Sequence, residues 1–388
     1  MEEDVMTELK LTNKGLPVGL LFSFNSLTSA VETTQHQATL LAIDEINSQG
    51  GVNGTPLAPV TADIGPDPTD YQSVARQLCN EHDVRILFGT HMSNQRKAAL
   101  PTIEKRDALL FYPTLYEGFE YSSNCIYTGA APNQNSVQLA RYVLKNHGNR
   151  ILFVGNNYVF AHESNRIMRD LFEEAGASVV DETYLPLNSP DDQIESVIRR
   201  AIMLAPDAIY STVVGADTIK LYEAFARSPL RNTGIPIVSL ATNEADLSQM
   251  SSEAAEGHIS AAPYFQSLQS PVSKAFVQRY LSRFGDGSPI TAGAEAAYFQ
   301  VHLFAKAARL AGELQLPTIL EAFGTARYDA PQGQVRIDTA THHTYLWPRI
   351  ARVDANKNFI IIEEEQGAVR PEPYMIQHTF EKNVAQNA

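Results

Sequence analysis

The stretch RILFVGNNYVFAHESNRIMRDLFEEAGASVVDETYLPL, residues 150–187, alternates between two kinds of secondary structure. RILFVGNN (150–157) is a short apolar run that is typical of a buried strand, and SVVDETYLPL (178–187) indicates a second strand. Between them, ESNRIMRDLFEEAG (163–176) has apolar residues at helical spacing and ends in a glycine. A strand, a helix and a strand in this order predict a βαβ unit with parallel strands and a right-handed crossover.

The first part of the chain repeats this alternation between residues 17 and 114. Glycines and an Asn-Gly turn punctuate the pattern, as they do between strands and helices of a compact sheet. This segment therefore predicts one doubly wound parallel sheet. Strands are expected at 17–24, 55–64, 84–90 and 109–114, and helices at 35–51, 69–82 and from Ser93 onward.

The pattern restarts at residue 125 and predicts a second doubly wound unit. Strand and helix patterns alternate as far as residue 242, and helical patterns return at 273–284 and 294–312. The tail from Gln332 differs, because QVRID, YLWPRIARVD and FIIIEEE indicate the strands of a late meander. No Pro- or Gly-rich linker separates the two units, so we expect several short crossings, placed near residues 132, 262 and 345.

The predicted fold class is therefore α/β, with two doubly wound parallel-sheet lobes joined by three crossings and a ligand cleft between them. The N-terminal lobe is expected to hold residues 15–132 and 263–345, and the C-terminal lobe residues 133–262 and 346–388. Open parallel sheets bind ligands outside the carboxyl ends of their strands. Binding residues are therefore sought where the predicted strands end.

Charge and composition exclude several classes of partner. The chain has 388 residues and a formal net charge of -14 without a cluster of Lys or Arg, which argues against binding nucleic acid or an anionic membrane. No stretch approaches the roughly 20 apolar residues that span a bilayer. Residues 1–15 lack the features of a secretory signal, so a chain that starts naturally at Met1 is expected in the cytoplasm. A chain that had lost its signal peptide would belong in the periplasm.

The sequence lacks the usual catalytic and cofactor motifs. It contains no GxGxxG or P-loop pattern, no HExxH, no CxxC and no GxSxG, so we expect a binding protein without a cofactor rather than an enzyme. His342-His343 has no carboxylate or Cys at ligand spacing, which favours a solvated loop or a capping role over a metal site. Cys79 and Cys125 are interpreted as two reduced structural thiols rather than a disulfide.

Two neighbouring strand ends of the first unit carry hydroxyl groups. Ser93 falls at a helix start, where its side chain and the free N–H groups can bind a carbonyl or carboxylate oxygen. Tyr112 and Thr114 stand at the end of the next strand. Taken singly, Ser93 can be a helix cap and the YPT segment an ordinary turn. Their positions at adjacent strand ends favour ligand binding.

The second unit supplies five further candidates, also at strand ends: Tyr158, Thr212, Gly215, Thr242 and Glu244. The Tyr158 ring can close a small pocket or pack between lobes. Glu244 can accept N–H groups of a ligand or cap the helix that starts at EADLSQM. Several hydroxyls and one acid predict a small neutral ligand that has both donor and acceptor groups.

Several segments resemble type I periplasmic binding proteins, and within that family the branch that binds amides and urea. The resemblance spans almost the whole chain in order. The branch is indicated mainly by YPTLYEG and APNQN. The resembling segments are FYPTLYEGFEYSSN (111–124), YTGAAPNQNS (127–136), ESNRIMR (163–169), STVVG (211–215), EGHISAAPYF (256–265), AEAAYFQ (294–300), DAPQGQVRID (329–338) and RPEPY (370–374).

This resemblance implies a clamp of two lobes that holds a small neutral amide or urea. It implies that Ser93, Tyr112 and Thr114 hold the carbonyl and amide nitrogen, with an aromatic near Tyr158 and an acid at Glu244 from the opposite lobe. The sequence departs from the relatives at Phe160, where they often have Tyr, and at Thr90-His91, where they have a Cys followed by an aromatic residue.

Two functions are compatible with this resemblance. The first is negative regulation of an amidase operon by a cytoplasmic receptor. Such a receptor senses short-chain aliphatic amides and holds an antiterminator protein of the AmiR type inactive until an inducing amide binds. The alternative is a substrate-binding receptor of an ABC transporter for urea or short-chain amides. The N-terminus favours the regulator, and a homodimer is kept as an open alternative. Neither function predicts direct contact with nucleic acid.

Overall fold

The structure is a computed structural model, and it describes residues 9–375. The chain forms two compact units. Among the described residues, unit 1 holds 9–114, 120–129 and 269–346, and unit 2 holds 115–119, 130–268 and 347–375. The polar start of the chain and the end of the predicted C-terminal lobe, residues 376–388, lie outside the described residues.

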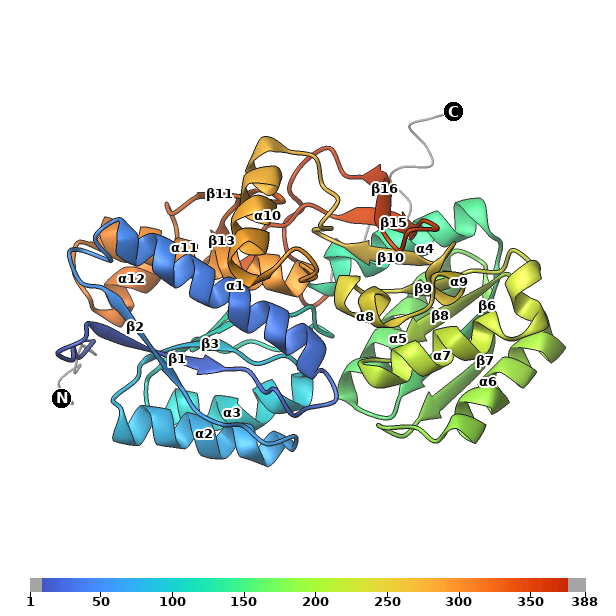
Figure 1. Ribbon diagram of the computed structural model, residues 1–388, viewed down its shortest axis with the longest axis horizontal. Helices are drawn as coiled ribbons and strands as arrows, with labels where there is room; N and C mark the ends of the chain where they lie inside the picture. Colours follow the sequence, from blue (N-terminus) through green and yellow to red (C-terminus); the bar gives the residue numbers. More distant parts are fainter. Residues whose placement is uncertain (1–8, 376–388) are drawn as a thin grey trace. The chain divides into compact units, whose positions relative to one another are not determined.

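Unit 1 contains a seven-stranded sheet in the order β13-β14-β5-β4-β3-β1-β2. The first five strands of the chain pair in parallel, and helices cover both faces, with α2 and α3 on one and α1 and α11 on the other (Figure 1). Its elements are β1 (Leu16–Leu21), α1 (Ser29–Ser48), β2 (Leu57–Thr61), α2 (Pro68–Glu81), β3 (Ile86–Gly89), α3 (Ser93–Lys105), β4 (Leu109–Tyr112), β5 (Cys125–Tyr127), α10 (Pro271–Phe284), α11 (Ala292–Ala311), α12 (Leu316–Ala322), the hairpin β11 (Tyr328–Ala330) and β12 (Gly333–Val335), β13 (Ile337–Asp338) and β14 (His343–Thr344).

Unit 2 repeats this plan with a seven-stranded sheet in the order β16-β15-β10-β9-β8-β6-β7. The strands from β6 to β10 are parallel, and β15 and β16 add to one edge in antiparallel pairing. Its elements are α4 (Ser136–Asn146), β6 (Arg150–Asn156), α5 (Val159–Glu174), β7 (Ser178–Leu185), α6 (Asp191–Leu204), β8 (Ala208–Thr212), α7 (Ala216–Ala226), β9 (Ile237–Ser239), α8 (Glu244–Gln249), α9 (Ser252–Ala255), β10 (Ile259–Ala262), β15 (Arg349–Val353) and β16 (Phe359–Glu364).

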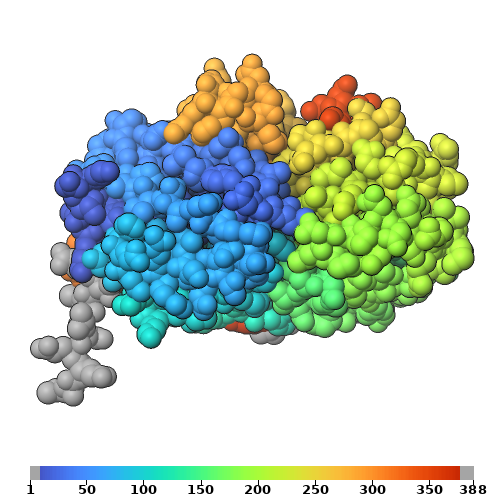
Figure 2. All heavy atoms as spheres, turned by 60° about the horizontal axis from the view of Figure 1, so that its bottom comes forward, coloured from blue at the N-terminus to red at the C-terminus, as the bar shows by residue number. Residues whose placement is uncertain are grey.

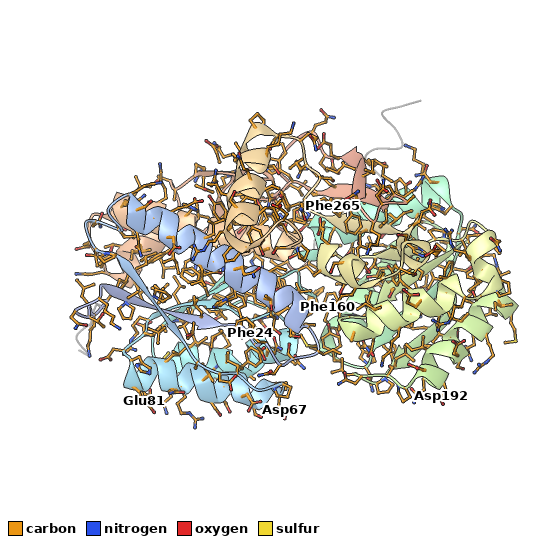
Figure 3. All side chains as sticks on the ribbon, viewed as in Figure 1. Phe24, Asp67, Glu81, Phe160, Asp192 and Phe265 are labelled. Carbon is orange, nitrogen blue, oxygen red and sulfur yellow. The ribbon has the colours of Figure 1, made fainter. Side chains whose placement is uncertain are left out.

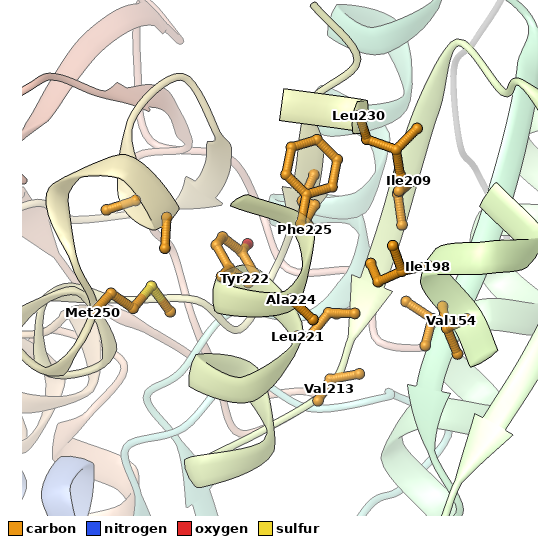
Figure 4. Packing of buried hydrophobic residues seen from close by; sticks show 14 of the residues in the cluster. Val154, Ile198, Ile209, Val213, Leu221, Tyr222, Ala224, Phe225, Leu230 and Met250 are labelled. Atoms are coloured by element: carbon orange, nitrogen blue, oxygen red, sulfur yellow. The ribbon is translucent and has the colours of Figure 1, made fainter. Parts of the chain in front are cut away.

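The core of unit 2 explains why its strands are almost continuously apolar. One cluster joins the sheet to α6 and α7 through Val154, Ile198, Ile209, Leu221 and Phe225, and none of these side chains is more than 2% exposed (Figure 4). A second cluster joins the opposite face to α4 and α5. Because helices cover both faces, strands such as β6 and β8 bury nearly every side chain, which is the pattern of a parallel sheet.

The outer faces of the covering helices lie at the surface of each unit. Figure 2 shows the light-blue atoms of α2 exposed in this way on unit 1 and the yellow-green helices on unit 2.

Cys79, on α2, and Cys125, on β5, are buried and not bonded to each other. No helix within residues 9–375 has the length and apolar character that a membrane span requires.

Two sequence predictions need correction. Helix α1 begins at Ser29, before the expected start at residue 35, because polar side chains of its first turns are buried and hide the helical pattern. The late meander is also wrong in its pairing. Strands β13 and β14 join the sheet of unit 1 beside β5, whereas β15 and β16 join that of unit 2 beside β10. Both sheets have an open edge there, and the tail supplies one antiparallel pair to each.

Candidate functional site

The strand order locates a crevice at the edge of each sheet. β1 lies between β2 and β3, and β6 lies between β7 and β8. The connections that leave β1 and β3 turn to opposite faces of the sheet, which opens a crevice at the carboxyl ends of these two strands. The same holds for β6 and β8 in unit 2. The loops after these four strands are therefore the places to examine for binding groups.

Glu32 shapes the loop that follows β1. Its side chain is fully buried on the first turn of α1, and its carboxylate accepts hydrogen bonds from the backbone N–H of Ser23 at 2.8 Å and the Tyr71 hydroxyl at 2.6 Å. The hydroxyls of Ser26 and Thr28 donate to the same carboxylate. These bonds fix the loop after β1 at the edge of the sheet.

Phe24, in the same loop, is 52% exposed. It follows β1 at the carboxyl edge of the unit 1 sheet, and its ring packs edge-on against His36 with 5.1 Å between ring centroids (Figure 3). Burial lowers the pKa of His36, so this imidazole is uncharged at neutral pH. An exposed aromatic beside a neutral ring gives this edge an apolar wall.

Gln35, His91 and Thr114 form a hydrogen-bonded triangle at the ends of β3 and β4. The Gln35 Nε2 group donates to Thr114 Oγ1 at 2.9 Å, and Gln35 Oε1 lies 3.2 Å from His91 Nδ1. The Thr114 hydroxyl lies 3.3 Å from the same ring nitrogen. A Cβ on Gly293 would come within 2.6 Å of Gln35 Nε2, so the missing side chain there lets α11 begin against this triangle.

The triangle offers one donor and one acceptor to a ligand. Because the Gln35 carbonyl can only accept, His91 Nδ1 carries the proton, which leaves His91 Nε2 as an acceptor and the Thr114 hydroxyl hydrogen as a donor. Turning the Gln35 amide over reverses both roles and again leaves one of each. Burial lowers the pKa of His91, and the nearby Glu32 carboxylate only partly opposes this shift. The imidazole of His91 and the hydroxyl of Thr114 are therefore both uncharged.

Ser93 is the first residue of α3 and does not cap it. Met92 occupies the capping position, and Gln95 Oε1 accepts the free backbone N–H groups of Met92 at 2.7 Å and His91 at 3.1 Å. The alternative interpretation of Ser93 as a cap is therefore wrong, because Gln95 does that work. Ser93 is 2% exposed, and its hydroxyl accepts a hydrogen bond of 3.4 Å from Arg96.

Tyr112 is the last residue of β4 and is fully buried. Its hydroxyl donates to the backbone carbonyl of His91 at 2.7 Å, so it ties the end of β4 to the loop after β3. The guanidinium of Arg96 lies 4.5 Å from the centre of its ring. Of the predicted residues in unit 1, Ser93, Tyr112 and Thr114 therefore do come together at one edge of the sheet.

Behind these residues, Arg96 is completely buried and paired with Glu120. Its Nε donates to Glu120 at 2.7 Å, and the Glu120 carboxylate also accepts from Lys97 at 2.6 Å and from the Tyr127 hydroxyl at 2.9 Å. Burial alone would raise the pKa of Glu120, but the charges and hydrogen bonds of Arg96 and Lys97 lower it to about 2. The charge of Arg96 is thus balanced within unit 1.

In unit 2, Tyr158 precedes the first turn of α5 and is half-buried. Its ring lies 6.0 Å from that of Phe160, which is 4% exposed and marks the start of α5 in Figure 3. The Phe160 ring packs into the interior of unit 2. A Tyr at this position would have to bury its hydroxyl there. Tyr158 is therefore the more accessible ring of the two.

Thr212 is the last residue of β8 and Gly215 follows the strand, but the two differ in what they can offer a ligand. Thr212 is fully buried, and its hydroxyl donates inward to the Asn165 side chain of α5 at 2.9 Å. Gly215 has φ 60° and ψ -139° at the start of α7, a conformation that residues with a Cβ avoid. The backbone of Gly215 can therefore approach a ligand, whereas Thr212 supports the fold.

Asn156 holds the two strand ends of unit 2 together. Its Oδ1 accepts from the backbone N–H of Val214 at 2.9 Å, and its Nδ2 donates to Asp217 at 3.0 Å. Asp217 is fully buried and also accepts from the backbone N–H of Ser189. This network fixes the ends of β6, β7 and β8 relative to α7, as Glu32 fixes the loop after β1.

Thr242 and Glu244 follow β9. The Thr242 hydroxyl forms a hydrogen bond of 2.9 Å with the Tyr222 hydroxyl. The Glu244 carboxylate accepts a hydrogen bond from the backbone N–H of Gln266 at 2.9 Å. Asn243, not Glu244, caps α8, because its Oδ1 accepts from the backbone N–H of Ala245. The alternative interpretation of Glu244 as a helix cap is therefore wrong, and this carboxyl joins β9 to the segment after β10.

Glu244 should make the stability of the protein pH-dependent. Burial raises its pKa from 4.5 to about 7, despite the opposing hydrogen bond from Gln266. The folded state then binds a proton more tightly than the unfolded state, so stability falls as pH rises from about 4.5 to 7. Replacing Glu244 with Gln should reduce this fall by about 1–2 kcal/mol in denaturant melts at pH 5 and pH 8. Glu253→Gln, at an exposed position of α9, is the control, and identical pH profiles for the two variants would refute the assignment.

Several groups at these edges were not among the sequence predictions. Glu32, Gln35 and Asn156 are buried polar side chains, and His91 was noted only as a departure from relatives. The ends of β1 and β6 could have been singled out from the doubly wound pattern, because a change of winding direction marks the crevice. No feature of the sequence indicated the hydrogen bonds themselves.

The histidine doublet was interpreted as a solvated loop or a cap, which is wrong for His343. This side chain is 1% exposed and stacks on the Tyr127 ring with 4.3 Å between centroids. Burial lowers its pKa to about 4, so it is a neutral part of the core. Within residues 9–375, no cluster of three or more His, Cys, Asp or Glu side chains could hold a metal ion.

Residues 16–379 match the family model of the periplasmic binding protein domain. Among curated proteins, the Leu/Ile/Val-binding protein homolog 6 of Brucella melitensis is 21% identical over 283 residues, which are 71% of this chain and 72% of that protein. A leucine-, isoleucine-, valine-, threonine- and alanine-binding protein of Pseudomonas aeruginosa is 22% identical over 309 residues, covering 78% of this chain and 80% of its own length.

Solved structures share the fold over nearly the whole chain. A solute-binding protein of an ABC transporter from Rhodopseudomonas palustris, in complex with 3,4-dihydroxybenzoic acid, has a TM-score of 0.82 and 19% identity, with 92% of this chain and 98% of that one covered. A branched-chain amino acid transporter substrate-binding protein from Streptococcus pneumoniae, in complex with isoleucine, has a TM-score of 0.76 and 20% identity, with 91% and 100% covered. Identities this low show the fold alone, and they confirm the predicted two-lobed α/β architecture.

Proposed function

The chain belongs to the periplasmic binding protein family, and on this basis we propose that it is the substrate-binding receptor of an ABC transporter for short-chain amides or urea. The chain is a binding protein and not an enzyme. The relatives named above are also binding proteins. The proposed ligand is small and neutral. The proposed ligand-binding groups are Ser93, Tyr112 and Thr114 in unit 1 and Tyr158, Gly215, Thr242 and Glu244 in unit 2, while Thr212 supports β8 from within.

The triangle of Gln35, His91 and Thr114 carries the choice of ligand class. An amide or urea presents a carbonyl acceptor beside an N–H donor, and the triangle leaves one donor and one acceptor for such a pair. Burial keeps His91 uncharged, and Arg96 already shares its charge with Glu120. A ligand carboxylate would therefore lose its hydration without meeting an uncompensated cation among these side chains.

The transporter role is supported by the relatives, since the Rhodopseudomonas palustris and Streptococcus pneumoniae proteins are both described as transporter receptors. A second candidate is an amide sensor that sequesters an antiterminator protein, and the likeness of residues 111–124 and 127–136 to amide receptors favours it. The compartment follows from the role: the periplasm for a transporter receptor and the cytoplasm for the sensor. Purifying the chain from its native cells with either a permease or an antiterminator would separate the two.

Acetamide or urea should bind with a stoichiometry of one per chain in isothermal titration calorimetry. Leucine, isoleucine and 3,4-dihydroxybenzoate should bind at least about a hundredfold more weakly, because burying an unpaired carboxylate costs more than about 2.7 kcal/mol. The titrations should be run at one pH and salt concentration so that the affinities compare directly. Tight binding of an amino acid without any response to acetamide or urea would refute the amide assignment while leaving the receptor role intact.

A further inference from the structure

Unit 1 has a second recess at the other end of α1. Gln35 and Glu45 lie on the same helix, about 15 Å apart along its axis at 1.5 Å per residue, so this recess is separate from the triangle at the carboxyl edge. It has a volume of about 530 Å³ and is lined by the last turn of α1 and by residues of α10, α11 and β11. Nothing in the proposed amide site uses it.

Glu45 is the one acidic side chain that lines this recess, among the residues that the structure describes. Its carboxylate accepts from the Tyr298 hydroxyl at 2.6 Å and from Arg279 at 2.7 Å, and it lies 3.2 Å from His302 Nε2. Burial would raise the pKa of Glu45, but the hydrogen bonds from His302, Tyr298 and Arg279 and the charge of Arg279 lower it to about 2. Its charge is therefore permanent and is balanced by Arg279.

Two further cations remain after this pairing. Lys306 and Arg309 lie three residues apart on α11, so their side chains emerge on the same face of the helix. Lys306 makes no hydrogen bond or ion pair with residues 9–375, and Arg309 uses one nitrogen to bond the Gly51 carbonyl at 2.7 Å. The recess thus has two uncompensated positive charges in a chain whose net charge is -14.

We propose that this recess is a binding site for a small anion that carries phosphate or carboxylate groups. The Lys306 ammonium would act as a point charge with three donors, and the free donors of the Arg309 guanidinium would bind two oxygens of one group. Bonding to Gly51 holds Arg309 against the end of α1, which reduces the cost of ordering its side chain. The volume of the recess accommodates a molecule larger than a single phosphate ion.

Titration of the whole chain with inorganic phosphate and, separately, with citrate tests the proposal by calorimetry at low salt. At least one of the two should bind saturably, and the stronger binder identifies the preferred group. Lys306→Glu should weaken this binding about tenfold, equivalent to about 1.4 kcal/mol, because it replaces an attraction with a repulsion. The matched control is Lys274→Glu on α10, an exposed lysine of the same unit outside the recess, which should change the affinity by less than about twofold.

Glu45→Gln is expected to change the anion affinity in the direction opposite to Lys306→Glu. It removes the only acid that lines the recess within the described residues, so phosphate or citrate should bind more tightly. Acetamide affinity should stay unchanged in Lys306→Glu, which shows that the variant folds and separates this proposal from the amide site. The proposal would be overturned if neither anion bound saturably to the unaltered chain, or if Lys306→Glu and Lys274→Glu had equal effects.

Discussion

Arg96→Met is expected to lower the free energy of unfolding by about 3 kcal/mol, the lower end for a broken buried ion pair, because it removes the buried partner of Glu120 and leaves this carboxylate to the exposed Lys97 and the Tyr127 hydroxyl. Arg96 is fully buried, whereas its partner Glu120 retains 13% side-chain exposure. Methionine preserves much of the volume between the Tyr112 and Tyr127 rings, so the loss reports the charge more than a cavity. Urea melts at pH 7 measure it.

The matched control for this variant is Lys97→Met, because Lys97 pairs with the same carboxylate from a position that is 42% exposed. An exposed ion pair contributes at most about 1 kcal/mol, so the two variants should differ severalfold. The folded pKa of Glu120 is about 2, below its ordinary 4.5, so the stabilisation is present at neutral pH and disappears as pH falls from 4.5 towards 2. Equal destabilisation by both variants would contradict the structural role given to Arg96.

The sequence predicted the architecture well where burial is apolar. Strands such as β6 and β8 are short apolar runs because helices cover both faces of the sheet, and that pattern is visible without a structure. The start of α1 was missed for the opposite reason. Glu32 and Gln35 face inward there, and a buried polar side chain has the same sequence signature as a solvated one.

The pairing of the tail could not be predicted because it depends on distant partners. Residues 337–344 and 349–364 look alike as short strands, but β14 pairs with β5 and β15 pairs with β10. Each pair completes the sheet whose edge lies within reach. Local propensity fixes neither partner, since strand pairing reflects side-chain packing and available edges rather than the strand alone.

The candidate site was predicted in part. The residues for which the sequence and the structure disagree are again buried polar groups. Ser93, Tyr112 and Thr114 follow strands, so the rule for parallel sheets locates them. Thr212 satisfies the same rule but turns its hydroxyl inward to Asn165. Which way a side chain at a strand end points depends on the pleat and on its partners, and a sequence of hydroxyl residues does not encode that choice.

Thr114→Val should weaken binding of the proposed amide ligand by about 10- to 100-fold, which corresponds to about 1.4–2.8 kcal/mol. Valine keeps the shape of the side chain and removes the hydroxyl. Gln35 Nε2 then loses its acceptor at 2.9 Å, and a ligand carbonyl loses the donor that the triangle leaves free. The loss for Gln35 lowers stability, whereas a ligand carbonyl buried without a partner costs about 1–3 kcal/mol, which sets the size of the expected loss of affinity.

Calorimetry with acetamide measures this loss, and Thr344→Val on β14 is the matched control. Thr344 is also fully buried and donates its hydroxyl to the Tyr127 carbonyl at 2.9 Å, but β5 and β4 separate β14 from β3 and β1 in the sheet order, so it lies away from the crevice. It should cost stability without changing acetamide affinity, whereas Thr114→Val should lower both stability and acetamide affinity. Unchanged acetamide affinity in Thr114→Val would show that the triangle supports the loop after β3 and does not contact the ligand.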